Sequence, residues 1–296
     1  MLPLRGAYAP IPTPFEKDEI AFDKLTVNLE VWGRSSLDGL VVLGTNGEAV
    51  FLDHEEKIAL IKHVRENFPA EKPVVAGTGC ESARETLKLT DAAASAGADA
   101  ALVITPHFYK GGMQEANLKA FYNEVADHSP IPVVLYNMPR NTGLNLPAKL
   151  VTELSYHENI VSVKDSSGDI VQISEITAHC HEDFSVFAGS AGFLLPSLIM
   201  GAVGGTMAVA NIIPEHCSDI FKYFREGRLH EAQSLQQRIL PLNKAVTAGF
   251  GVAGLKAAMD MLGYYYGGNP RLPLLPLDEN QKEELKGIMQ KAEVIN

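Results

Sequence analysis

The chain has little cysteine, no long apolar run and a shortage of basic residues. Its three cysteines are too few and too scattered for a disulfide framework, and their odd number indicates a reducing compartment. We interpret Cys80, Cys180 and Cys217 as buried thiols. No charge-free apolar stretch approaches the roughly 20 residues that span a bilayer, and residues 1–6 lack the hydrophobic segment of a signal peptide. We therefore expect a cytoplasmic protein with no membrane partner.

The charge balance excludes a further class of partner. Lys and Arg number 25 against 36 Asp and Glu, for a formal net charge of −11. Nucleic acid and anionic membranes reward clustered basic side chains, which are missing, so we expect neither as a partner. With 46% hydrophobic and 21% charged residues in a chain of 296, the composition predicts a globular protein with one large domain or a domain plus an appendage.

Short apolar runs recur along the chain, each followed by a loop rich in Gly, Thr, Ser and Pro. Most successive runs are about 25 to 35 residues apart, which matches a repeated strand–helix–strand unit and predicts a parallel sheet covered by helices. The expected strands cover residues 6–9, 39–43, 74–76, 100–104, 133–136, 160–163, 184–188 and 205–209.

Two architectures fit this rhythm, a doubly wound sheet and a closed barrel. A dinucleotide-binding sheet should carry Gly-x-Gly-x-x-Gly after its first strand, whereas the early loop at 10–15 reads PIPTPF. The count of eight favours a (β/α)8 TIM barrel. Between the strands, Asp53 can cap a helix that begins with acidic residues, and another helix at 82–96 should end at Gly97.

The pattern changes near residue 227. Three helical segments are expected at 229–244, 252–262 and 279–292, with no strand between them. We therefore divide the chain into a barrel that carries the active site (1–226) and a C-terminal α-helical region (227–296), which packs on the barrel or on another subunit.

Lys164 follows the apolar, mostly β-branched strand at 160–163. A charged side chain is unusual at the end of a buried strand, so its presence calls for an explanation. An ammonium that leaves water for an apolar site loses its hydration and gives up its proton more easily, and the free amine attacks carbonyl carbon. The plainer alternative is an ordinary ion pair or a side chain that reaches solvent.

Other loops that follow strands should meet Lys164 at the same end of the barrel, because catalytic groups lie at the C-terminal face of this fold. Residues 44–48 (GTNGE) present backbone N–H groups with the side chains of Thr45 and Asn46, which suit a carboxylate or phosphate. Tyr136 places a phenol after another strand, where it can exchange protons with a bound carbonyl or can simply be a core residue. Together these groups predict a site for a 2-oxo acid.

Four motifs carry a resemblance to a known superfamily: GTNGE at 44–48, YNMP at 136–139, VKDS at 163–166 and FAGS at 187–190. They resemble the dihydrodipicolinate synthase and N-acetylneuraminate lyase superfamily of class I aldolases, over the whole length. Within it the motifs are most similar to 4-hydroxy-2-oxoglutarate aldolase, including GTGCES at 77–82 and GYYYGG at 263–268.

The resemblance implies a (β/α)8 homotetramer without a metal or an organic cofactor, and a Schiff base between Lys164 and pyruvate or a longer 2-oxo acid. It implies that Thr45 and Asn46 hold the carboxylate and that Tyr136 relays protons, with Thr45 as a possible link. Ser166 would touch the substrate hydroxyl or distal group, and the Gly189 backbone would line the site.

At two positions the chain departs from the motifs of the superfamily, which limits how far the superfamily's residue roles can be assigned to it. The synthases usually carry an arginine two residues after the proline of the YNMP motif, where this chain has Asn141, and Arg140 lies one position earlier. Phe108 stands where many members have a tyrosine whose relay crosses the subunit interface, so either Tyr109 replaces it or the relay is shorter.

We therefore expect a Schiff-base aldolase that cleaves or forms a 4-hydroxy-2-oxo acid from pyruvate and an aldehyde such as glyoxylate. The residues that we expect to recognise the aldehyde half of the substrate are Arg140, Asn141, Ser166 and Ser167. Three alternatives remain open. The first is 4-hydroxy-tetrahydrodipicolinate synthase, which condenses pyruvate with aspartate semialdehyde. The second is a non-catalytic 2-oxo acid binding protein. The third is a metal-dependent aldolase using the His-Cys-His run at 179–181, which the strand order places at the wrong end of the barrel.

Overall fold

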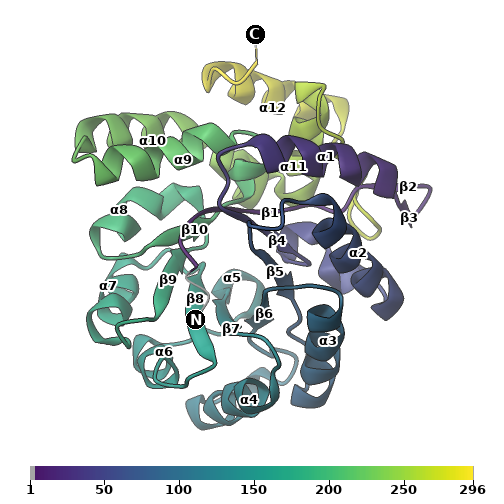
Figure 1. Ribbon diagram of the computed structural model, residues 1–296. Coiled ribbons are helices and arrows are strands. Elements are labelled where there is room, and N and C mark those ends of the chain that lie inside the picture. Colours follow the sequence, from purple (N-terminus) through teal and green to yellow (C-terminus); the bar gives the residue numbers. More distant parts are fainter. Residues whose placement is uncertain (1–3, 296) are drawn as a thin grey trace.

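The computed structural model describes residues 4–295, so residues 1–3 of the segment searched for a signal peptide lie outside it. Eight parallel strands close into a barrel in the order β1-β10-β9-β8-β7-β6-β5-β4, and β1 pairs with both β10 and β4. Figure 1 looks along this barrel and shows the strands in the centre with a ring of helices around them. The strands are β1 (Gly6–Pro10), β4 (Gly39–Val42), β5 (Val74–Gly77), β6 (Ala100–Ile104), β7 (Val133–Asn137), β8 (Ile160–Asp165), β9 (Ser185–Ala188) and β10 (Gly204–Thr206).

The predicted (β/α)8 barrel is confirmed, and a helix follows each strand before the next. These helices are α1 (Phe22–Arg34), α2 (His54–Asn67), α3 (Ala83–Ser95), α4 (Glu115–His128), α6 (Ala148–Leu154), α7 (Ile170–His179), α8 (Leu194–Ile199) and α9 (Pro214–Arg225). Shorter elements decorate the loops: the hairpin β2 (Phe15–Glu16) and β3 (Glu19–Ile20), the helix α5 (Pro139–Thr142), and single turns η1 (Thr45–Gly47), η2 (Ala49–Phe51), η3 (Lys110–Gly112), η4 (Ala191–Phe193) and η5 (Ala208–Asn211).

Local sequence explains where two of these helices begin and end. Asp53 caps α2 through a reciprocal capping box with Glu56, as the acidic first turn predicts. Ser82 caps α3, and Gly97 follows it with a φ of +96°, a conformation that glycine adopts without a Cβ clash. The prediction failed at the last strand. The apolar run at 205–209 is strand only to Thr206, because Asn211 Nδ2 bonds the Ala208 carbonyl and folds the next residues into η5.

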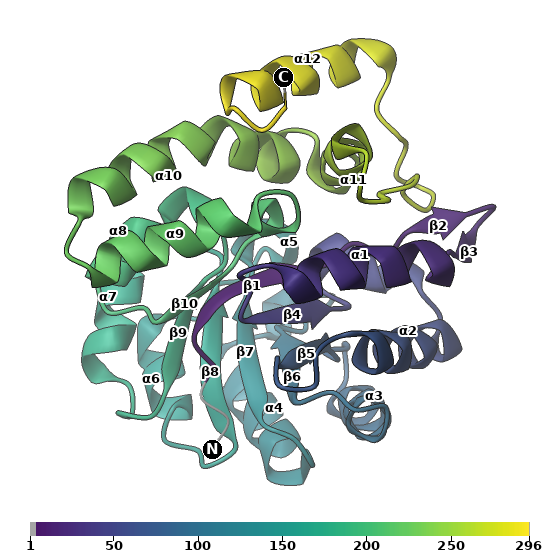
Figure 2. The ribbon, with the colours of Figure 1, turned by 45° about the horizontal axis from the view of Figure 1, so that its top comes forward.

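The C-terminal region is helical as predicted, with one feature that the pattern did not indicate. Helix α10 (Leu229–Lys244) runs into a π-helical turn, η6 (Ala245–Gly249), before α11 (Gly251–Leu262), and α12 (Glu279–Lys291) follows after a long connection. Figure 2 shows these helices stacked on one side of the barrel, beyond α9 and α1. One apolar cluster of buried residues extends from Ala7 in β1 to Ala292 after α12, so the C-terminal helices share a core with part of the barrel. We keep a division between residues 226 and 227 as a proposal.

Within residues 4–295 no helix combines the length and the apolar character needed to cross a bilayer. Of the three cysteines, only Cys217 is fully buried. Cys80 and Cys180 are partly exposed, so our interpretation of them as buried thiols was wrong. Both lie where a regular element has ended, Cys80 in the loop after β5 and Cys180 at the end of α7, and burial still raises the pKa of each thiol.

Candidate active site

The candidate site is a cavity of about 660 Å³ at the C-terminal mouth of the barrel. Its walls come from the loops after β4, β7, β8 and β9, and from the C-terminal helical region. Most of the residues that the sequence placed in the site line this one cavity: Thr45, Asn46, Tyr136, Arg140, Asn141, Lys164, Ser166 and Gly189. Ser167, the remaining candidate for the aldehyde end, does not line it, because its amide and its hydroxyl both donate to Asp165 Oδ1.

Lys164 and Tyr136 face each other inside the barrel. They are register partners on the neighbouring parallel strands β8 and β7, so their side chains project to the same face. The Lys164 Nζ lies 4.1 Å from the centroid of the Tyr136 ring, and each of the two residues is only 4% exposed. No ion-pair partner of Lys164 is found among the described residues. The plainer alternative that we weighed for this lysine, an ordinary ion pair or a side chain that reaches solvent, therefore does not describe its surroundings.

The loop after β4 brings a hydroxyl to the phenol. Thr45 Oγ1 and the Tyr136 hydroxyl are 3.1 Å apart, a hydrogen bond in which either can donate. The amides of Gly47 and Glu48 donate back to the carbonyls of Gly44 and Thr45, within the loop. The amides of Gly47 and Glu48 are therefore not available to an anion, which leaves the amides earlier in the loop, such as those of Thr45 and Asn46, for the anion cradle that the sequence suggested.

Ser166 and Gly189 meet at the floor of the mouth. The Gly189 amide donates to the Asp165 carbonyl at 2.7 Å, and a Cβ on Gly189 would lie 1.9 Å from Ser166 Oγ. That close approach explains why glycine occupies this position. Ser166 Oγ is buried and finds no hydrogen-bond partner within the described residues. A buried hydroxyl without a partner is costly, so it is suited to binding a polar group that enters the cavity.

Arg140 and Asn141 occupy the outer rim. Both are exposed residues of α5, and an Arg140 guanidinium nitrogen (Nη2) donates to the Ala248 carbonyl of η6 at 3.2 Å. Residues 247–253 and 274–275 form the wall opposite the strands. A π-turn widens a helix locally and is frequent at functional sites. This wall was not predicted from the sequence, where its signal is a pair of glycines, Gly249 and Gly251, that interrupts the helical pattern.

A buried carboxylate beside the lysine was also missed. Asp165 is fully buried, and because it follows Lys164 in the strand its side chain points outward, away from the cavity. Its oxygens accept hydrogen bonds from Asn137 Nδ2 at 2.9 Å, from Gln172 Nε2 at 2.8 Å and from the Ser167 amide at 2.8 Å. These contacts tie the end of β8 to β7 and α7. They fix the strand end that carries Lys164.

Two further predictions concern residues away from this cavity. Phe108 and Tyr109 are 75% and 74% exposed, and neither lines the cavity in the described chain, so a replacement relay through Tyr109 stays untested. His179 lies at the end of α7, and His181 packs against the ring of Tyr156. Across residues 4–295, no three His, Cys, Asp or Glu side chains gather as a metal site would require.

A parallel eight-stranded barrel with a buried amine, a phenol and an unpartnered hydroxyl at its C-terminal mouth defines a class of barrel enzyme suited to imine chemistry. Comparison with known proteins makes this specific. The model of the dihydrodipicolinate synthetase family matches residues 3–292, and the chain belongs to that family of pyruvate-dependent class I aldolases, enzymes that make or break carbon–carbon bonds.

Among curated proteins, the 4-hydroxy-tetrahydrodipicolinate synthase of Methanothrix thermoacetophila is 38% identical over 291 residues, which cover 97% of this chain and 96% of that protein. The synthase of Thermoanaerobacter sp. is 34% identical over 288 residues, with 97% and 96% covered. Among solved structures, the dihydrodipicolinate synthases of Bacillus anthracis and Acinetobacter baumannii, the latter complexed with pyruvate, each share 30% identity and cover 98% of this chain and 99% of theirs. Their TM-scores are 0.94 and 0.93.

These names support the superfamily that the motifs indicated. They favour the synthase, which the sequence analysis held as an alternative, over the 4-hydroxy-2-oxoglutarate aldolase that it preferred.

Proposed function

We propose that the enzyme forms an imine between Lys164 and pyruvate and joins it to an aldehyde that carries its own carboxylate, with aspartate semialdehyde as the first candidate. The relatives named as synthases support that partner. The observation that carries the imine chemistry is the placement of the Lys164 amine 4.1 Å from the Tyr136 ring centroid inside the mouth.

The proposed sequence begins with the free amine of Lys164. It attacks C2 of pyruvate and a water molecule leaves, which gives a protonated imine that draws electrons from the neighbouring methyl group. Loss of a methyl proton gives the enamine, whose carbon attacks the aldehyde and forms the new carbon–carbon bond. The aldehyde oxygen takes a proton. Attack on the imine carbon by the amine of aspartate semialdehyde closes the ring and frees Lys164, so one water is lost overall.

Tyr136 is the proposed proton carrier. Its hydroxyl bonds Thr45 Oγ1 at 3.1 Å and can pass a proton in either direction along that contact. We assign the pyruvate carboxylate to Thr45 and Asn46, whose side chains line the cavity. Ser166 is assigned to the distal group, since its buried hydroxyl has no partner within the described residues.

A second candidate is reversible cleavage of a 4-hydroxy-2-oxo acid to pyruvate and glyoxylate. It is favoured by Asn141 at the position where the synthases usually carry arginine. Arg140 lies at the rim of the same cavity and offers a cation for a carboxylate, although its guanidinium is engaged by the Ala248 carbonyl. Both candidates use an aldehyde with a carboxylate, so they differ only in the length and the amine of that partner.

The imine is tested by adding borohydride with pyruvate and locating the adduct by mass spectrometry. We expect reduced pyruvate on Lys164, and no adduct in Lys164→Arg, which keeps a cation but not the nucleophile. An unlabelled wild-type protein would leave only the binding-protein alternative. Pyruvate is then offered with aspartate semialdehyde or glyoxylate and kcat/KM is compared. A higher value with glyoxylate would transfer the assignment to the aldolase.

The homotetramer is also a proposal. The exposed pair Phe108 and Tyr109, with ring centroids 5.1 Å apart, offers an apolar contact for a second copy of the chain. Light scattering coupled to size exclusion would test the assembly.

A further inference from the structure

The loop that carries Thr45 is bent into an unfavourable backbone conformation. It is bracketed by Leu43 with φ of 58° and Glu48 with φ of 55°, both in the left-handed region although neither is glycine. Both residues are almost completely buried. Non-glycine residues keep this conformation only where their surroundings hold them, and such positions cluster at functional sites.

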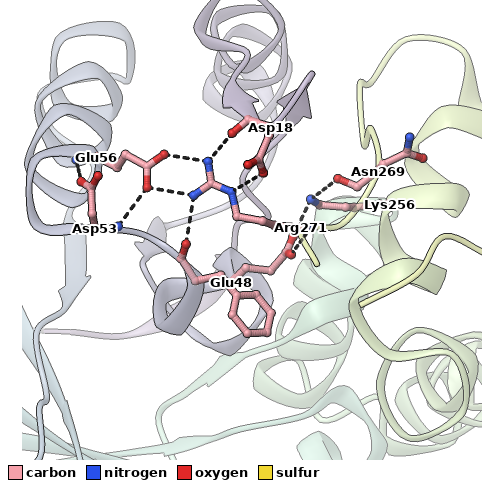
Figure 3. Close-up of polar contacts among 8 residues, drawn as sticks. Asp18, Glu48, Asp53, Glu56, Lys256, Asn269 and Arg271 are labelled. Carbon is pink, nitrogen blue, oxygen red and sulfur yellow. Dashed lines mark hydrogen bonds and ion pairs between the residues drawn. The ribbon is translucent and has the colours of Figure 1, made fainter. Parts of the chain in front are cut away.

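Glu48 is held by a buried ion pair with the C-terminal helices. Its Oε1 lies 2.5 Å from the Nζ of Lys256 in α11, and the two side chains are 1% and 0% exposed. Its Oε2 accepts the backbone N–H of Arg271 at 2.8 Å, and Lys256 Nζ also donates to the Asn269 carbonyl at 3.0 Å. Figure 3 shows Glu48 between these two partners. One carboxylate oxygen of Glu48 is therefore ion-paired with Lys256 without making a hydrogen bond within the described residues, and the other accepts a hydrogen bond from Arg271, although the residue borders the cavity.

The guanidinium of Arg271 extends the contact to three other segments. It bonds both oxygens of Glu56 in α2, at 2.8 and 2.7 Å, and the Phe51 carbonyl of η2 at 2.9 Å. It also pairs with Asp18 in the β2–β3 hairpin. We call the set Glu48, Lys256, Arg271 and Glu56 the clamp (Figure 3). The clamp joins the loop at 44–51 to residues more than 200 positions later.

Stability alone does not explain the buried part of the clamp. Two charges taken out of water lose hydration, and a buried ion pair can often be replaced by apolar residues without loss of stability. Burial lowers the pKa of Lys256, and the Glu48 carboxylate opposes that shift. What the pair provides is a defined geometry for a residue three positions after Thr45.

We propose that Glu48 and Lys256 are positioning residues of the reaction, which hold Thr45 in hydrogen-bond contact with Tyr136. This inference rests on the proposed function, and it assigns the C-terminal helices a part in catalysis that the sequence division did not suggest. Lys256 reaches the loop only because α11 lies beside the mouth, where residues 251–253 line the cavity.

The test compares Glu48→Gln, Lys256→Met and the double variant with Lys72→Met as a matched control. Lys72 is a partly buried lysine, whereas Lys256 is fully buried; the Lys72 amine bonds the carbonyls of Gly33 and Ser35, and Lys72 precedes β5 at the opposite end of the barrel. Turnover and the midpoint of thermal unfolding are measured for each. Each variant is also combined with Thr45→Val, which removes the hydroxyl through which the clamp is proposed to act.

We expect Glu48→Gln to lower kcat by about 10- to 100-fold, the scale of a displacement near 1 Å in a catalytic group. In the Thr45→Val background the same change should alter kcat by less than about two-fold, because coupled sites are not additive. The variant that combines Glu48→Gln with Lys256→Met should be more stable to heat than either single variant, because it leaves no buried charge without a partner. Its kcat should nevertheless stay low. An equal loss in both backgrounds, or an equal loss in Lys72→Met, would overturn the inference.

Amide hydrogen exchange separates this inference from the proposed function. Exchange in residues 44–52 should be faster in Glu48→Gln than in the wild type and unchanged in Lys72→Met. That readout needs no substrate, so it still decides the role of the clamp if pyruvate fails to label Lys164. Unchanged exchange in Glu48→Gln would overturn the clamp even in an active enzyme.

Discussion

Replacement of Gly189 by alanine tests the packing of the mouth. The new Cβ would lie 1.9 Å from Ser166 Oγ, 2.8 Å from Ser166 Cβ and 2.9 Å from the Asp165 carbonyl oxygen. Non-bonded heavy atoms rest at about 3.5–4.0 Å, so Ser166 must move by roughly 1 Å or more. The carbonyl cannot simply turn away, because it accepts the Gly189 amide at 2.7 Å.

Overpacking of this kind typically destabilises a protein by about 1–3 kcal/mol. The larger effect should fall on catalysis. Ser166 is two residues from Lys164, and a displacement near 1 Å in a reacting group costs about 10²-fold in rate. We expect Gly189→Ala to lower kcat by about that factor while the protein remains folded.

Urea unfolding and steady-state turnover measure the two effects. The control is Gly287→Ala in α12, where a Cβ meets no atom within 4 Å and helix propensity alone should raise stability by about 0.5–1 kcal/mol. Adding Ser166→Gly to Gly189→Ala removes the two closest atoms and should restore part of the lost stability. Wild-type stability and kcat in Gly189→Ala would refute the steric argument.

Two other predictions concern proton transfer by Tyr136 and the titration of the Glu56 carboxylate. Tyr136→Phe removes the hydroxyl that bonds Thr45 and should lower turnover by about 10²- to 10⁴-fold, the usual range for a general acid or base; a near-normal rate would reassign that role. The hydrogen bonds from Arg271 lower the pKa of Glu56 below its ordinary value of 4.5, so its stabilisation is full above that value and is lost as the pH falls through the folded-state pKa. Urea unfolding from about pH 6 down to about pH 3 should therefore cost the wild type more stability than Glu56→Gln, and parallel pH profiles would contradict this assignment.

The barrel could be predicted because its signals are local. Each strand is a β-branched or small apolar run bounded by turn residues, and the loops that follow them carry the motifs. The predicted site residues Thr45, Tyr136 and Lys164 converge because all parallel strands end at one mouth. Once the order of strands is known, no further knowledge of packing is needed to bring these residues together.

The clamp could not be predicted because its partners are distant in sequence. Glu48 was part of a recognised motif, but nothing near it indicates that its carboxylate is buried against Lys256 or reaches Arg271. The π-turn at 245–249 was missed for a related reason. Its sequence reads as helix on either side, and it is the folded structure, through contacts such as that of Ala248 with Arg140, that shows which loop the turn faces.

The pairing of β1 with β10, which closes the barrel, also determines when β1 can complete its backbone hydrogen bonds during synthesis. β1 finds its neighbour β4 soon after it emerges, but its other neighbour, β10, is made about 200 residues later. At synthesis rates of about 5–20 residues per second, that interval is roughly 10–40 s. During it one edge of β1 has free backbone donors and acceptors, which can capture a strand of another chain. The yield of folded enzyme should therefore depend on how well the cell shields that edge until translation has passed β10.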